Sequence, residues 1–161
     1  MSPTDLAAFN ALPESEARLR LQGVCASASW ADTVAAARPF AERDDLYAAA
    51  DDALAALREP DLDEALAGHP RIGERGTSAD SRREQSGVSD ASREALADGN
   101  RAYEERFGHV YLVCASGRTG DELLALLRER LSNDPTAERR VARDELGKIN
   151  RLRLRRLVEK S

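Results

Sequence analysis

Apolar residues recur at intervals of three and four along most of this 161-residue chain, and this spacing constrains the fold more than any other feature. Such intervals place side chains on one face of an α-helix. Aromatic residues make up only 4% of the chain, so a core must consist mainly of Leu, Ala, Val and Ile, and packed helices are favoured. The sequence therefore predicts an all-α helical bundle. The clearest stripe consists of Leu46, Ala49, Ala50, Ala53, Leu54 and Leu57.

The length is typical of a chain that buries one core, and we expect a single domain over residues 1–161. Caps, prolines and glycines set the expected helix limits. Gly68 is a typical C-terminal stop, and Ser89 or Asp90 can cap the helix that follows Gly87. The expected helices cover residues 2–12, 12–27, 29–40, 43–57, 60–68, 81–108 with an interruption near 87, 119–134 and 134–160.

One stretch departs from the helical pattern. "HVYLVCASG", which starts at His109, is apolar, rich in β-branched residues and bounded by glycines. These properties predict a short, buried, extended segment near residues 109–115. Because the chain has no second stretch of this kind, we expect the segment to thread between helices rather than to join a sheet.

Charge and composition exclude several classes of partner. The net charge of −5 opposes non-specific binding to nucleic acid, which needs an excess of Lys and Arg. No stretch approaches the roughly 18 apolar residues of a membrane span, and the N-terminus lacks the pattern of a signal peptide. Cys25 and Cys114 belong to no redox or zinc motif, so we expect buried thiols in a reducing compartment. The sequence thus predicts a cytoplasmic protein with no nucleic-acid or membrane partner; its oligomeric state, with a homodimer as one option, stays open.

The first candidate site residue is His69, one of two histidines in the chain. It follows the predicted helix end at Gly68, and Pro70 restricts its backbone to extended conformations. A histidine titrates near neutral pH, so a fixed imidazole can both take and give a proton. By itself, however, a histidine after a helix end is more often a surface or capping residue than a catalyst.

Polar residues follow this histidine across a loop rich in Gly, Ser and Arg, from residue 71 to 81. Ser81 and Glu84 fit the S-x-x-E capping box, a purely structural role. Gln85 is less easily explained as a cap. A Glu-Gln pair could instead bind the N–H and C=O groups of a ligand.

The last predicted helix carries a basic stretch, "KINRLRLRRL". Most of its arginines fit a solvated face near the negative end of the helix dipole. Arg153 lies beside the apolar stripe of Ile149 and Leu152, and a partly buried arginine needs an anion or a carbonyl as its partner. By contrast, no metal site is expected, because His69 and His109 lack companions at ligand spacing.

Taken together, these stretches resemble the 2-oxo-4-hydroxy-4-carboxy-5-ureidoimidazoline (OHCU) decarboxylase family of urate degradation. The resemblance rests on "AGHPRIGERG", "SRREQSGV", "NRAYEERFGHVYLVCASGRT" and "KINRLRLRRL", which occur in the family order. It implies an all-helical carboxy-lyase that acts in purine metabolism on a small ureidoimidazoline substrate. The implied product is (S)-allantoin, and no cofactor is expected.

The resemblance also implies roles for individual residues. His69 would be the catalytic acid/base, assisted by Glu84 and Arg153. The implied substrate contacts are Pro70, Ser81, Gln85, Tyr111, Leu112 and Val113. Two positions depart from the family pattern: Asp80 replaces a frequent tryptophan, and His109 replaces a frequent aromatic residue. One alternative is a hydrolase that acts on a related ureido compound. A second, less favoured alternative is a helical interaction module.

Overall fold

A computed structural model of the chain describes residues 5–73 and 90–159. All regular structure within these ranges is helical, as the sequence predicted. The predicted site residues Ser81, Glu84 and Gln85 lie outside the described residues. The helices are α1 (Asp5–Ala11), α2 (Glu14–Val24), α3 (Ala28–Ala36), α4 (Arg43–Ala55), α5 (Glu59–Ala67), α7 (Asp90–Phe107), α8 (Gly120–Arg130) and α9 (Pro135–Val158).

The chain divides into two compact units. The first unit extends to Gly68 and resumes at Gly147, so it includes the C-terminal half of α9; the second unit runs from His69 to Leu146. The expectation of one domain over residues 1–161 stays a prediction.

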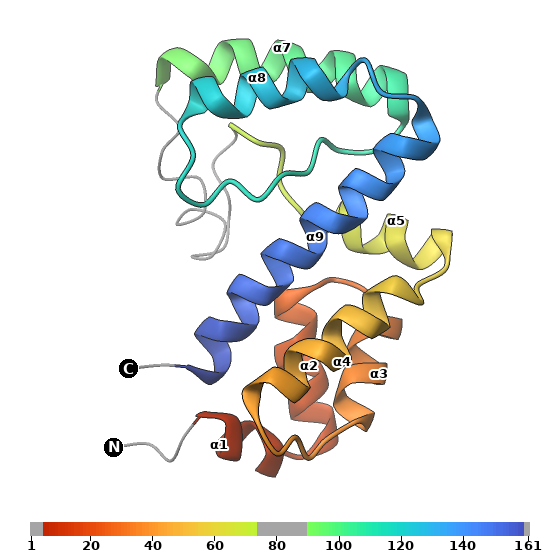
Figure 1. The fold of residues 1–161 in the computed structure, drawn as a ribbon, viewed down its shortest axis with the longest axis vertical. Helices are drawn as coiled ribbons and strands as arrows, with labels where there is room; N and C mark the ends of the chain where they lie inside the picture. Colours follow the sequence, from red (N-terminus) through yellow and green to blue (C-terminus); the bar gives the residue numbers. More distant parts are fainter. Residues whose placement is uncertain (1–4, 74–89, 160–161) are drawn as a thin grey trace. The chain divides into compact units, whose positions relative to one another are not determined.

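The first unit is built around packed α2, α3 and α4, of which α3 contacts both neighbours (Figure 1). The single tryptophan, Trp30 on α3, is fully buried there. Its indole Nε1 donates to the Ala50 carbonyl of α4 at 3.0 Å, which satisfies the one polar atom of the ring. Leucines and alanines fill the rest, as the composition required; the largest fully buried ones in this unit are Leu21, Leu46, Leu62 and Leu66.

The turn between α2 and α3 corrects one expected helix limit. The sequence placed Ser27 at the end of a helix over 12–27, but α2 ends at Val24 and Ser27 is the N-cap of α3. The Ser27 hydroxyl accepts from the Trp30 amide at 3.1 Å, and a carboxylate oxygen of Glu64 accepts from the Ala28 amide at 3.1 Å. Two otherwise unpaired amides at the start of α3 are thereby satisfied, which explains why the helix restarts here.

The end of α5 lies against the same turn. Gly68 is the C-cap of α5, as predicted. A Cβ atom placed on Gly68 would lie only 2.5 Å from the Cβ of Ala26, closer than side chains pack. The backbone just before His69 is therefore held against the α2–α3 turn at a point that only glycine allows.

The buried stripe of α9 follows an interval of four residues. The apolar residues at broadly helical spacing in this helix, which are Val141, Leu146, Ile149, Leu152 and Leu157, predict a different stripe, and of these only Leu146 and Ile149 are buried. The reason is that two positions of the true stripe are polar, which a search for apolar residues passes over. Its members are Glu138, Ala142, Leu146, Asn150, Leu154 and Val158.

Polar contacts fix the C-terminal end of α9 to α4. The Tyr47 hydroxyl donates to the Glu159 carboxylate, and Arg43 forms an ion pair with the same carboxylate at 3.2 Å. Burial, followed by the contact with Glu159, raises the pKa of Tyr47 to about 12. Arg151 and Asp51 form a further pair at 3.0 Å, but both side chains are well exposed and such pairs contribute little.

Substitution of Gly68 tests the close approach to Ala26. Gly68→Ala should lower the free energy of unfolding by about 1–3 kcal/mol because the added methyl group overpacks the turn. Adding Ala26→Gly to this variant should recover most of the loss in chemical denaturation. Gly23→Ala is the matched control: nothing lies within 4 Å of the new methyl group, so it should be neutral or stabilising. Equal effects of the two alanine substitutions would contradict the packing argument.

The Tyr47 contact predicts a loss of stability at alkaline pH. A pKa raised in the folded state means that the contribution is complete below the unfolded value of about 10 and is lost as the pH rises toward about 12. The difference in unfolding free energy between the wild type and Tyr47→Phe should therefore shrink between pH 10 and 12. Urea unfolding at a series of pH values measures this difference. A difference in unfolding free energy that does not change with pH would refute the stabilising role of the Tyr47–Glu159 contact.

Candidate functional site

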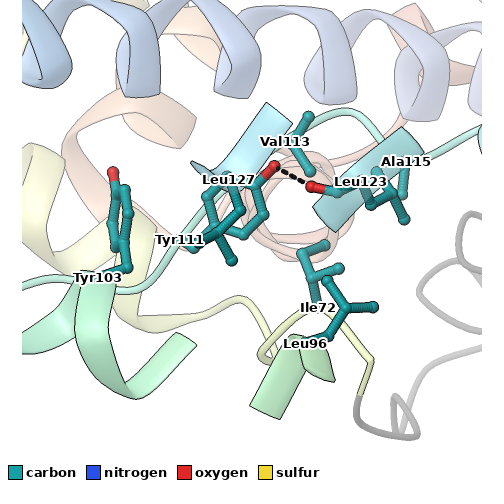
Figure 2. Close-up of a cluster of buried hydrophobic side chains, with 8 residues drawn as sticks. All are labelled: Ile72, Leu96, Tyr103, Tyr111, Val113, Ala115, Leu123 and Leu127. Atoms are coloured by element: carbon teal, nitrogen blue, oxygen red, sulfur yellow. Dashed lines mark hydrogen bonds between the residues drawn. The ribbon is translucent and has the colours of Figure 1, made fainter. Parts of the chain in front are cut away.

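The second unit has its own apolar core, in which the His-Pro stretch and the extended segment meet. Ile72, three residues after His69, packs in one buried cluster with Tyr111 and Val113 (Figure 2). The Tyr111 hydroxyl donates to the Leu123 carbonyl of α8 at 2.9 Å. Two stretches that the sequence selected separately are thus joined through their buried residues. The other members of the cluster are Leu96, Tyr103, Ala115, Leu123 and Leu127.

Side chains of α7 hold the chain downstream of His69. The Asn100 amide donates to the Ile72 carbonyl at 2.7 Å, and the Arg93 guanidinium donates to the Gly73 carbonyl at 3.0 Å. Gly73 has a φ of 95°, a left-handed conformation that favours glycine, and a Cβ on it would lie 3.2 Å from that of Leu96. The tight turn after the His-Pro stretch is therefore fixed both by hydrogen bonds and by shape.

His69 itself lies between two constrained points of the chain. It directly follows the C-cap Gly68, and both His69 and Pro70 are half-buried. Gly68 lies close to Ala26 within the first unit, and the 72–73 turn is bound to α7 within the second. The expectation of an imidazole on a stiff backbone stays a prediction.

The extended segment connects two helices that point the same way. Figure 1 shows α7 and α8 side by side in one direction, so the chain must return between them before α8 can begin. Residues 110–115 make this return without a strand partner, as the sequence predicted. Side chains take the partner's place: Arg130 Nη1 donates to the Leu112 carbonyl at 2.6 Å, and a Glu145 carboxylate oxygen accepts from the Cys114 amide at 2.9 Å.

A buried carboxylate holds Arg130 in this position. Glu138 is fully buried and accepts from Arg130 Nε at 2.8 Å and Nη2 at 2.5 Å, from Asn133 at 3.0 Å and from the Tyr103 hydroxyl. The Arg130 guanidinium also lies 4.8 Å from the centre of the Tyr111 ring. The network fixes the arginine, and through it the carbonyl of Leu112.

The electrostatics of the network favour this arrangement. Burial alone would lower the pKa of Arg130, but the Glu138 carboxylate outweighs it and raises that pKa. Burial, reinforced by Glu138, also raises the pKa of Tyr103 far above its ordinary value. At neutral pH Arg130 is therefore a cation, and Tyr103 is a neutral phenol whose hydroxyl donates a hydrogen bond to Glu138.

Arg153 belongs to the first unit, on the half of α9 that follows Gly147. It is half-buried, and its Nη1 donates to the Val24 carbonyl at the end of α2 at 3.1 Å. The sequence expected an anion or a carbonyl as the partner of this arginine, and a carbonyl is confirmed.

The predicted site residues thus fall into three groups. His69 and Pro70 belong to the second unit with Tyr111, Leu112 and Val113, which are buried, whereas Arg153 belongs to the first. Ser81, Glu84 and Gln85 lie outside the described residues. His109 is half-buried against aromatic neighbours, and its ring centre lies 5.6 Å from that of Tyr103.

A cleft of about 970 Å³ lies between the 71–73 turn and α7. Charges of both signs line it, including the ion pair of Arg71 with Glu104 at 2.8 Å. None of the described residues that line this cleft was predicted as a site residue. Within the described ranges, no cluster of ligating side chains suits a metal ion, and no helix is long and apolar enough to cross a membrane.

Sequence reasoning missed the residues that hold the site together. Arg130, Glu138 and Glu145 lie on helices with the pattern of ordinary amphipathic elements, and no motif in the sequence selects them. The one usable signal was the interval of four on α9, where Glu138 replaces an apolar residue. Its partners come from separate elements, and spacing in the sequence does not reveal them.

Comparison with known proteins identifies the family and the fold. The sequence model described as OHCU decarboxylase matches residues 10–155. The chain belongs to the OHCU decarboxylase family. It is 33% identical over 148 residues to the 2-oxo-4-hydroxy-4-carboxy-5-ureidoimidazoline decarboxylase of Amia calva, covering 84% of this chain and 81% of that protein. It is 32% identical over 144 residues to the uric acid degradation bifunctional protein TTL of Arabidopsis thaliana, covering 83% of this chain but only 44% of that longer protein.

A solved structure supports the same assignment. A crystal structure of an OHCU decarboxylase in the presence of (S)-allantoin superposes with a TM-score of 0.78 at 30% identity, covering 86% of this chain and 96% of that one. The resemblance drawn from the sequence motifs is confirmed, and so are the helical fold and the class of enzyme, a decarboxylating lyase.

Loss of Arg130 should destabilise the second unit. Arg130→Met would leave Glu138 buried without its cation, which should cost about 3–5 kcal/mol of unfolding free energy. Amide exchange of residues 110–115 should also accelerate, because the Leu112 carbonyl loses its donor. Arg128→Met is the matched control, since Arg128 is exposed on the same helix and should change the unfolding free energy by less than about 0.5 kcal/mol. Equal losses in the two variants would contradict the role of the network.

Proposed function

We propose that the protein converts 2-oxo-4-hydroxy-4-carboxy-5-ureidoimidazoline to (S)-allantoin and CO₂ in urate degradation, with His69 as general acid/base. The observation that carries the proposal is the His-Pro stretch, which is followed by a turn that is bound to α7 and packs against the extended segment. Membership of the OHCU decarboxylase family restricts the reaction class to decarboxylation.

The substrate can supply its own electron sink. The carbon that loses CO₂ carries a hydroxyl and adjoins a C=N bond. When the bond to the carboxylate breaks, its electron pair forms a C=C bond with the neighbouring carbon, and the C=N pair moves to nitrogen, which takes a proton from water. The hydroxyl loses its proton and becomes a ring carbonyl, and the neighbouring carbon gains a proton. Orientation and proton transfer are therefore the main tasks left to the protein.

His69 is proposed for the proton transfer. In this role the imidazole takes the hydroxyl proton as CO₂ leaves and returns a proton to one face of the neighbouring carbon. Delivery to one face requires a fixed direction of approach, which the bound turn at Ile72 and Gly73 supports. Glu84 is proposed to set the tautomer of the His69 imidazole.

The remaining residues are proposed to hold the substrate. Glu84 and Gln85 would bind the ureido group, and Ser81 and Pro70 would provide further contacts. Backbone groups at Tyr111, Leu112 and Val113 would bind the ring, supported by the side chains that fix this segment. Arg153 is proposed to bind a ring carbonyl or the developing enolate oxygen, because a tight grip on the departing carboxylate would stabilise the ground state and slow its loss.

Circular dichroism of a coupled reaction tests the proposal. Uricase and hydroxyisourate hydrolase generate the substrate from urate, and the wild type should then produce an optically active (S)-allantoin signal. His69→Ala should reduce kcat/KM at least a hundredfold, in line with the loss of a general acid/base, and leave slow racemic product. His109→Phe, which alters the other histidine, is the matched control and should retain activity. Full activity and stereoselectivity of His69→Ala would refute the assigned role.

A further inference from the structure

Asn150 is a polar residue in the buried stripe of α9. It lies between Leu146 and Leu154 at an interval of four, and only 3% of its surface is exposed. Neither its side-chain nitrogen nor its side-chain oxygen has a hydrogen-bond partner in the described structure. An unpaired buried polar group costs about 1–3 kcal/mol, so a residue with an unpaired donor and an unpaired acceptor needs a reason.

The other polar residue of the stripe, Glu138, shows how the fold provides partners for a buried polar group. Glu138 is equally inaccessible, but its carboxylate accepts from Arg130, Tyr103 and Asn133. The fold thus supplies partners for a buried group where that group serves stability. At Asn150 it supplies none, and an apolar residue there would fit the stripe better.

The neighbours of Asn150 point to a ligand. Arg153 lies three residues later, so both side chains emerge on adjacent parts of one helix face, with Cβ atoms about 5–6 Å apart. Both side chains also lie near the buried Cys25: burial raises the pKa of this thiol, whereas Asn150 and Arg153 oppose the increase. The amide nevertheless makes no contact of hydrogen-bonding geometry with the sulfur. A ligand bound at Arg153 would therefore lie beside Asn150, whose two unpaired atoms are covered in this structure and would have to be uncovered on binding.

We propose that Asn150 is a substrate-binding residue that pairs with an amide of the ligand at Arg153, its nitrogen donating to the ligand C=O and its oxygen accepting from the ligand N–H. An arginine only donates, whereas the asparagine side chain donates and accepts. It therefore complements the cyclic or ureido amides of an imidazoline substrate, and discriminates against analogues that lack the N–H. The inference rests on the proposed function, because it names the part of that substrate which α9 binds.

The test compares Asn150→Leu with the wild type in three measurements. The leucine has a similar size and no polar atoms, so the melting temperature should stay the same or rise. The affinity for (S)-allantoin, measured by titration calorimetry, should fall about tenfold, and kcat/KM in the coupled assay should fall by a similar factor. Ile149→Val is the matched control on the neighbouring buried position: it should lower the melting temperature and leave affinity and kcat/KM unchanged.

The alternative role is purely structural, with a buried water bridging the amide to its surroundings. That role predicts a lower melting temperature for Asn150→Leu with unchanged (S)-allantoin affinity and kcat/KM, and this result would overturn the inference. If the leucine variant does not fold, Asn150→Ala is measured in its place. A loss of (S)-allantoin affinity and kcat/KM would again support the inference, and unchanged values would overturn it. If the wild type turns over the substrate and the Asn150 variants have unchanged affinity and kcat/KM, only this inference is wrong. If the wild type itself shows no turnover, both the proposed function and this inference are wrong.

Discussion

The cost of burying one carboxylate shapes the second unit. A carboxylate removed from water is strongly destabilising unless it is paired and its oxygens accept hydrogen bonds. Glu138 meets this demand with Arg130, Tyr103 and Asn133, which come from α8, α7 and the turn before α9. Once Arg130 is fixed by this requirement, its remaining Nη1 can support only one part of the chain, the carbonyl of Leu112.

The extended segment owes its place to this arrangement. A chain that returns between two helices running in the same direction has unpaired amides and carbonyls, and here side chains satisfy two of them. Buried side chains of the segment alternate with these backbone contacts, with Tyr111 and Val113 in the core beside Ile72. The same core thus fixes the segment proposed to bind substrate and the turn that follows the proposed acid/base. Precise placement of reacting groups is what catalysis by proximity and orientation requires.

The sequence predicted the helices well because their apolar residues repeat at helical intervals, and it predicted the extended segment from its β-branched run. It misplaced Ser27 because a serine after a helix and a serine before one look alike until the turn geometry is known. It misassigned the stripe of α9 because Glu138 and Asn150 occupy positions where a pattern search expects apolar residues. For Arg153 the physical argument succeeded, since a half-buried guanidinium had to find a carbonyl or an anion. The motifs located His69, but the contacts that constrain it come from residues 30 positions away and more, such as Asn100 on Ile72 and Ala26 on Gly68.

Asn100 and Asn150 illustrate two uses of a buried amide in one protein. Asn100 donates to the Ile72 carbonyl and thereby positions the turn after the histidine. Asn150 has no such partner and is interpreted as prepared for a ligand.

The most direct test of this account follows the carbon atom that should leave. Urate labelled with ¹³C at the position that becomes the carboxylate is converted by uricase and hydroxyisourate hydrolase in the presence of the protein, and the products are followed by ¹³C NMR. The account predicts rapid, protein-dependent appearance of the label in CO₂ and bicarbonate, together with a single enantiomer of allantoin. Retention of the label in a carboxylate product with a cleaved ureido group would contradict it and indicate a hydrolase.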